Sequence, residues 1–178
     1  MARVVCITLN PALDLAFNLD ALTLGHVNRP TSAQLEAAGK GVNVARVLER
    51  ELARPSWRRE HVAMGTNTDP YQPIERRHKI TRQVLEVLLR FNHPVSVITK
   101  SDLICRDIDI LAPMAAQGLL RVGISLTTLD ADLSRRMEPR AAAPYKRLQT
   151  VRALADAGIE VIVMTAPIIP ALNEHEIE

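Results

Sequence analysis

Small polar and charged side chains follow four short apolar runs of this sequence. They fall in the segments 65–69 and 99–101, at residues 125–128, and in the turn 165–167. Ligands of parallel α/β proteins gather at the carboxyl ends of the strands, because the loops there vary while the strands fix their positions. Any one of these segments could simply form a turn or a cap, as Ser, Thr, Asn and Asp often do. Four of them on one edge instead predict a polar rim that binds a small molecule.

Two charged positions of this rim are the most informative. Lys100 places an ammonium group at a strand end, where it could pair with a carboxylate or phosphate of a ligand. The structural alternative is an ion pair with Asp69 or Asp102. Glu138 and Arg140 lie in a loop after the fourth strand, where they either fix the loop or grip a ribose and a carboxylate. Both interpretations stay open.

The apolar runs and their spacing predict the elements that must position these residues. Strands are expected at 3–9, 61–64, 94–99, 120–126 and 159–165, and helices at 41–53, 79–91, 103–117 and 144–157. This alternation is typical of parallel strands joined by right-handed helical crossovers. Weak alternation over 16–37 predicts short strands or an irregular flap, and Asn173 is expected to cap a last helix. The fold class is α/β.

Composition excludes several classes of protein. With 178 residues, 47% of them hydrophobic and 24% charged, the chain has the length and composition of one globular domain. Its net charge of +2 is too small to indicate a nucleic-acid or membrane surface. An arginine cluster is expected to be a solvated face, with an anionic ligand as the alternative. Its members are Arg54, Arg58, Arg59, Arg76 and Arg77.

Membrane, secretory and cysteine-dependent classes are also disfavoured. No apolar run reaches the ~18 residues of a membrane span, and the first residues lack the features of a signal peptide, so a cytoplasmic protein is expected. The two cysteines, Cys6 and Cys105, are far apart in the sequence. They indicate neither a disulfide framework nor a thiolate metal site.

Residues 50–178 carry a family resemblance in five segments. These are RELARPSWRREHVAMGTNTDPYQPIE, HPVSVITKS, GISLTTLD, RRMEPRAAAP and VIVMTAPIIPALNEHE. In order and spacing they resemble the middle of radical S-adenosylmethionine (SAM) proteins of the group similar to spore photoproduct lyase. The resemblance implies a partial, open TIM-type barrel with SAM on its rim.

The resemblance also implies roles for rim residues. It places the loop Thr66, Asn67, Thr68 and Asp69 near the methionine amino group and Lys100 at the carboxylate. Ser125 and Thr127 would lie at the ribose, and the turn of Ala166 and Pro167 at the adenine. Arg140 joins this expected cofactor set.

One departure from the family is severe. Such enzymes hold a 4Fe-4S cluster with a Cys-x-x-x-Cys-x-x-Cys loop, because iron requires soft, charged thiolate ligands. This sequence has no such triplet. We therefore expect no metal ligands and no reductive cleavage of SAM by this chain alone.

Residues 1–49 resemble a different family. The segments ITLNPALDLAF and GHVNRPTSAQLEAAGKGVNVARVLE resemble the amino terminus of 1-phosphofructokinases, which are ribokinase-like sugar kinases. The resemblance implies that Asp14 contacts sugar hydroxyls and that four further residues shape the sugar-phosphate pocket. They are Gly39, Lys40, Gly41 and Asn43. A lysine among free amides at a helix start also suits an anion. The ATP site and catalytic aspartate of that family are absent here.

The two segments are expected to form one compact unit, because ARVLERELA reads as a continuous helix across their junction. Three functions stay open. The chain is a truncated radical SAM-like domain that retains SAM binding, a sugar-phosphate-binding remnant of a kinase, or a non-catalytic fusion product or interaction module. In each case open barrel edges predict self-association.

Overall fold

A five-stranded parallel sheet forms the centre of the molecule. The computed structural model describes residues 4–7, 11–18 and 32–176, and their side chains from Ala45 onward. The strands are β1 (Val4–Ile7), β4 (His61–Met64), β5 (Val95–Thr99), β6 (Leu120–Ser125) and β7 (Val161–Met164). They lie in the order β1-β4-β5-β6-β7, and every neighbouring pair is parallel. The predicted α/β class with parallel strands is confirmed.

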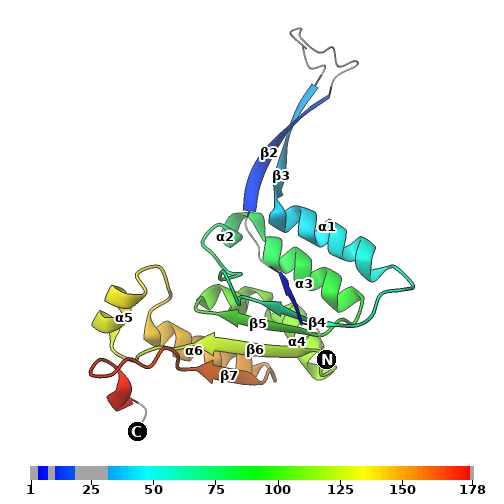
Figure 1. Cartoon of the computed structure of the whole chain (residues 1–178). Coiled ribbons are helices and arrows are strands. Elements are labelled where there is room, and N and C mark those ends of the chain that lie inside the picture. The colour runs from blue at the N-terminus through cyan, green and yellow to red at the C-terminus, as the bar shows by residue number, and fades with distance from the viewer. Residues whose placement is uncertain (1–3, 8–10, 19–31, 177–178) are drawn as a thin grey trace.

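Helices connect the strands and cover one face of the sheet (Figure 1). The principal ones are α1 (Lys40–Leu52), α3 (Ile80–Arg90), α4 (Ile108–Ala116) and α6 (Pro144–Asp156). The helix expected at 103–117 is divided into a 3-10 helix, η1 (Asp102–Asp107), and α4. Two short helices were not predicted, α2 (Glu75–His78) and α5 (Ala131–Met137). No helix among the described residues is long and apolar enough to cross a membrane.

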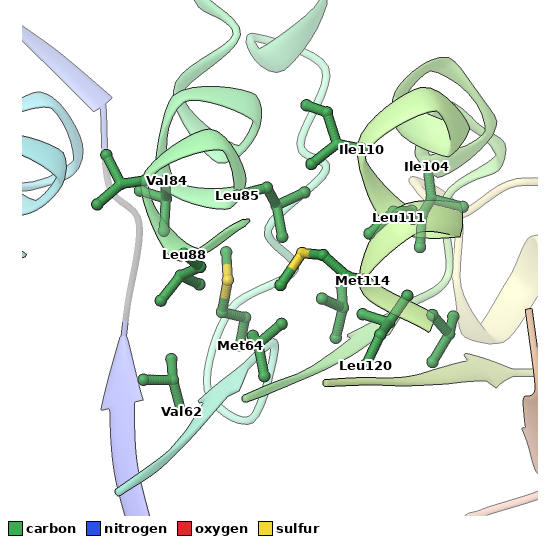
Figure 2. Close-up of a cluster of buried hydrophobic side chains, with 14 of the residues drawn as sticks. Val62, Met64, Val84, Leu85, Leu88, Ile104, Ile110, Leu111, Met114 and Leu120 are labelled. Atoms are coloured by element: carbon green, nitrogen blue, oxygen red, sulfur yellow. The ribbon is translucent and has the colours of Figure 1, made fainter. Parts of the chain in front are cut away.

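The core lies between the sheet and these helices. Figure 2 shows side chains of β4, including Met64, pointing toward Leu85 and Leu88 of α3 and Met114 of α4. In β5 the alternate residues 95, 97 and 99 are buried, whereas 96 and 98 are half-buried on the opposite face. Each fully buried Leu or Met stabilises the fold by roughly 1.5–3 kcal/mol. This packing holds the carboxyl ends of β4, β5 and β6 in fixed register.

A separate two-stranded ribbon precedes α1. It consists of β2 (Pro11–Asn18) and β3 (Ser32–Gly39), which pair antiparallel with Leu15 opposite Leu35. The ribbon extends away from the sheet (Figure 1). It agrees with the short strands that were one of the alternatives for residues 16–37; residues 19–31 lie outside the described part of the chain.

Candidate functional site

Asp69 ties the loop after β4 to the end of β5. Its Oδ1 accepts from the Thr99 hydroxyl (2.7 Å) and the Tyr71 amide (2.8 Å), and its Oδ2 accepts from the Lys100 amide (2.9 Å). The loop begins at Gly65, where φ is +94° and a Cβ atom would lie 2.0 Å from the Ile98 carbonyl oxygen. Only glycine fits such an approach. Asp69 is therefore an organising acceptor within the rim.

Glu138, in the loop after α5, is shared by three donors. Its Oε1 accepts from the ammonium of Lys100 and from the hydroxyl of Thr127 (2.9 Å), and its Oε2 accepts from Arg147 Nη2 (2.6 Å). Burial raises the pKa of Glu138, but the hydrogen bonds from Lys100, Arg147 and Thr127 outweigh it and the pKa lies below its usual value. The ion pair of Lys100 is thus made with Glu138, not with Asp69 or Asp102 as the structural alternative supposed.

Arg147 of α6 is a buried cation that the sequence did not reveal as part of the site. Its side chain is 1% exposed. Besides Glu138, it donates from Nε to the Ala142 carbonyl (2.6 Å) and from Nη1 to the Ser125 carbonyl (2.9 Å). Buried charges are tolerated when they are paired and fully hydrogen-bonded. Arg147 thereby joins the end of β6 to the loop between α5 and α6.

Asn173 joins the ends of β6 and β7. Its Nδ2 donates to the carbonyls of Thr127 (2.7 Å) and Pro167 (3.0 Å), and its Oδ1 accepts from the Ile169 amide (2.6 Å). The Thr127 hydroxyl also lies 3.4 Å from the Ala166 carbonyl. The last helix expected after Asn173 is present, but the Asn173 side chain bonds to these loops and does not cap it. This helix is a short 3-10 helix, η2 (Glu174–Glu176).

The structure therefore brings most of the predicted rim together. Hydrogen bonds through Glu138, Arg147 and Asn173 link the rim residues after β4, β5, β6 and β7. The linked residues are Asp69, Lys100, Ser125, Thr127, Ala166 and Pro167. Thr66, Asn67 and Thr68 are exposed in the β4 loop. In the sequence, Glu138 was indicated only by its place in a loop, two residues before Arg140.

A cleft of about 800 Å³ opens beside the rim. Of the expected cofactor residues, Asp69, Lys100 and Arg140 line it, together with Arg76 and Lys146 from two different helices. Its size is within the range of small-molecule sites, roughly 300–1,000 Å³. Polar groups from three separate loops converge on it, as ligand orientation requires.

The kinase-like residues occupy the ribbon and the start of α1. Asp14 is paired with Glu36 in the β2–β3 register, and Gly39 ends β3. Lys40, Gly41 and Asn43 fall in the first turn of α1, so the expected helix start is present. Their side chains lie outside the described part of the structure, and their sugar-phosphate role stays a prediction.

The cysteines do not form a metal-binding group. Cys6 lies in β1 and Cys105 in η1, and these are the two cysteines of the 178 residues. Burial raises the pKa of the Cys105 thiol, which disfavours its thiolate. Within the described part of the chain, no three His, Cys, Asp or Glu side chains are arranged to hold a metal ion.

Comparison with known proteins adds family information. The Radical SAM superfamily matches residues 38–178. An uncharacterized protein of Mycobacterium tuberculosis is 42% identical over 132 residues, which cover 74% of this chain and 39% of that protein. The chain spans less than half the length of the curated relatives it matches over this region.

Two further similarities concern the fold and the first residues. A structure of spore photoproduct lyase complexed with dinucleoside spore photoproduct superimposes with a TM-score of 0.52 at 15% identity. The superposition covers 78% of this chain and 38% of the lyase chain, and it shows that the two share a fold. The 1-phosphofructokinase of Vibrio cholerae is 56% identical over 46 residues, 26% of this chain and 14% of that enzyme.

Proposed function

The chain belongs to the radical SAM superfamily, and from this membership we propose that its polar rim binds S-adenosylmethionine. One observation carries the proposal: a continuous hydrogen-bonded network joins the ends of four neighbouring strands and holds Lys100 and Thr127 on the same carboxylate. Such preorganised polar groups at the carboxyl edge of a parallel sheet are what a polar cofactor requires.

Each rim segment has a proposed role. Lys100, whose side chain is 37% exposed, binds the methionine carboxylate, because Glu138 occupies only one of the donors of its ammonium group. The loop from Thr66 to Asp69 faces the methionine amino group, and Arg140 lies at the same end. Ser125 and Thr127 contact the ribose, and the turn of Ala166 and Pro167 contacts the adenine.

The iron–sulfur cluster of the superfamily does not fit this chain. Three clustered thiolates would have to hold it. Cys6 lies on a strand of the sheet and Cys105 on η1, beyond β5, and no third cysteine exists in the sequence. We propose SAM binding without reductive cleavage by this chain alone. Anaerobic reconstitution with iron and sulfide tests this point, and a product with four irons per chain would overturn it.

Thermal and urea unfolding with added SAM test the binding. A single site should raise the free energy of unfolding by about 2.7 kcal/mol at 100 times the dissociation constant. Lys100→Met should weaken this stabilisation, measured against the same variant without ligand. Lys146→Met is the matched control, because Lys146 also lines the cleft but faces Asp102 at 3.8 Å. No stabilisation by millimolar SAM in the unaltered chain would reject the proposal.

A second candidate function is binding of a sugar phosphate by the first residues. The 56% identity to a 1-phosphofructokinase over 46 residues favours it, as does the helix start at Lys40. Fructose 1-phosphate should then protect the chain from unfolding, and Lys40→Met should remove the protection. Protection that is absent, or unchanged in the variant, would dismiss this candidate.

A further inference from the structure

The cleft beside the rim carries positive charge that its own carboxylates do not neutralise. Asp69 is engaged by Thr99 and two backbone amides, and Glu138 is shared between Lys100 and Arg147. Asp102, the third carboxylate of the lining, faces Lys146. The acidic groups of the cleft are therefore all committed to partners within the protein.

Two arginines of the lining remain without such a partner. Arg76 on α2 and Arg140 in the loop between α5 and α6 are both exposed and both line the cleft. Neither forms an ion pair or side-chain hydrogen bond with any residue that the structure describes. An unpaired guanidinium in a concave site is available to an anionic ligand.

The backbone that carries Arg76 is anchored by its neighbour. Glu75 is 2% exposed, and its Oε1 accepts from the Thr81 amide at 3.0 Å. Its carbonyl accepts from Arg106 Nη1 at 2.7 Å. A buried acid thus fixes α2, and the residue after it is presented on the wall of the cleft.

The loop that carries Arg140 is anchored on both sides. The Ala141 amide donates to the Glu138 carbonyl (3.0 Å), and the Ala142 amide donates to the Lys100 carbonyl (3.2 Å). Arg140 therefore stands on the same hydrogen-bonded framework as Lys100. Because both arginines emerge from fixed backbone, little conformational entropy beyond that of the side chains is lost when they grip a ligand.

We propose that this cleft binds a phosphate-bearing ligand, a phosphate monoester or a phosphodiester, through Arg76 and Arg140. The planar guanidinium offers paired donors that match phosphate oxygens, and two of them supply the charge that a phosphate requires. The site adjoins the methionine end of the proposed cofactor rim, because Asp69, Lys100 and Arg140 line the cleft as well. It is distinct from the rest of that rim, because Ser125, Thr127, Ala166 and Pro167 do not line the cleft. It would accommodate the anionic part of a substrate or of a second ligand.

Arg76→Gln tests the proposal, with Arg77→Gln as the matched control. Arg77 has the same charge, helix and exposure but does not line the cleft. Dissociation constants of inorganic pyrophosphate and of a short single-stranded oligodeoxynucleotide are measured by calorimetry at constant ionic strength. Arg76→Gln should weaken binding about tenfold, the loss of one charged hydrogen-bonding group, and Arg77→Gln should leave it nearly unchanged.

The two probes distinguish the sources of the phosphate. Loss of pyrophosphate binding in Arg76→Gln supports the site and assigns it to compact phosphates. Loss confined to the oligodeoxynucleotide supports the site and assigns it to phosphodiesters. Equal effects of the two substitutions on both probes, or no binding of either probe to the unaltered chain, would overturn the proposal. SAM binding is followed separately, and because Arg76 is outside the cofactor set, either proposal can fail while the other stands.

Discussion

A single carboxylate organises the rim at the scale of residues. Glu138 accepts from Lys100 after β5, from Thr127 after β6 and from Arg147 of α6. Two cations surround one anion, so the group keeps a net positive charge that suits an anionic ligand part. Removing a partner from such a buried pair costs more than the pair itself contributes, because the remaining charge loses its compensation.

The acid stability of the fold should depend on Glu138. Its pKa is lower in the folded protein than the unfolded value of 4.5. A carboxyl group of this kind stabilises the fold above pH 4.5, and the contribution is lost as the pH falls through the lower, folded pKa. Glu138→Gln should therefore unfold at lower urea concentration at neutral pH and show a smaller further loss below pH 4.5.

Comparing the unaltered chain with Glu138→Gln separates the effect of Glu138 on acid stability from the effects of the other carboxyl groups. Asp109 and Asp130 also have lowered pKa values, so acid sensitivity persists in both. Parallel curves of urea midpoint against pH would contradict the role assigned to Glu138.

Arg147→Met should be among the most destabilising single changes. It leaves Glu138 without its buried partner and two carbonyls without donors, and loss of a buried ion-pair partner costs roughly 3–5 kcal/mol. Glu138→Gln in the same chain should recover part of the loss, because the two changes act on one interaction. Urea unfolding of both single variants and the double variant measures the coupling, and strictly additive effects would show that the two side chains act independently.

At the scale of elements, the regular spacing of apolar residues predicted the principal strands and helices. The features that depend on tertiary contacts were missed. Short apolar runs located β4, β5 and β6, because buried parallel strands are apolar on both faces. The same kind of run located β7, although β7 is an exposed edge strand. Amphipathic spacing located α1 and α3. The boundary between η1 and α4 lies at Asp107, which is 0% exposed and accepts hydrogen bonds from Arg106 and from Arg82. The contact with Arg82 spans 25 residues of sequence, and such a contact has no local signal.

The sequence likewise indicated some residues of the candidate site and missed others. Strand ends indicated Asp69, Lys100 and Thr127, since the position of a loop follows from its strand. Arg147 reads as an ordinary helix residue, and its burial follows from carbonyls 5 and 22 residues away. α5 had a local signal that was overlooked: Asp130 accepts from the amides of Asp132 and Leu133 and caps this helix.

The turn after β4 should not tolerate a side chain. At Gly65 a Cβ atom would lie 2.0 Å from the Ile98 carbonyl oxygen, and φ is +94°. Gly65→Ala should destabilise the fold by about 3 kcal/mol or more, because β4 and β5 must separate as well as absorb backbone strain.

Gly158→Ala is the control for this prediction. Gly158 also has a positive φ, +75°, but a Cβ atom added there would meet no heavy atom within 4 Å beyond its chain neighbours. It should lose only about 1 kcal/mol, the cost of the left-handed conformation. Equal losses of unfolding free energy in the two variants would show that the β4–β5 contact is not the limiting factor.

At the scale of the whole molecule, the sheet is open. β1 and β7 are its two edges, and no described strand pairs with the outer side of either. β7 exposes apolar side chains along this edge: Ile162 is 53% exposed, Val163 44% and Met164 37%. An edge strand with free backbone donors and acceptors and apolar side chains is a template for pairing with another chain. This bears on the alternative function of an interaction module, because the same edge would receive its partner.

Self-association should therefore proceed through β7. Ile162→Lys should reduce it, because a charge on an edge strand opposes strand pairing. Leu148→Lys is the control, since Leu148 on α6 is 47% exposed and belongs to a helix. Light scattering after size exclusion should show an apparent mass that rises with concentration in the unaltered chain and in Leu148→Lys, and less so in Ile162→Lys. A monomeric mass at every concentration in the unaltered chain would mean that the exposed edge alone does not drive association.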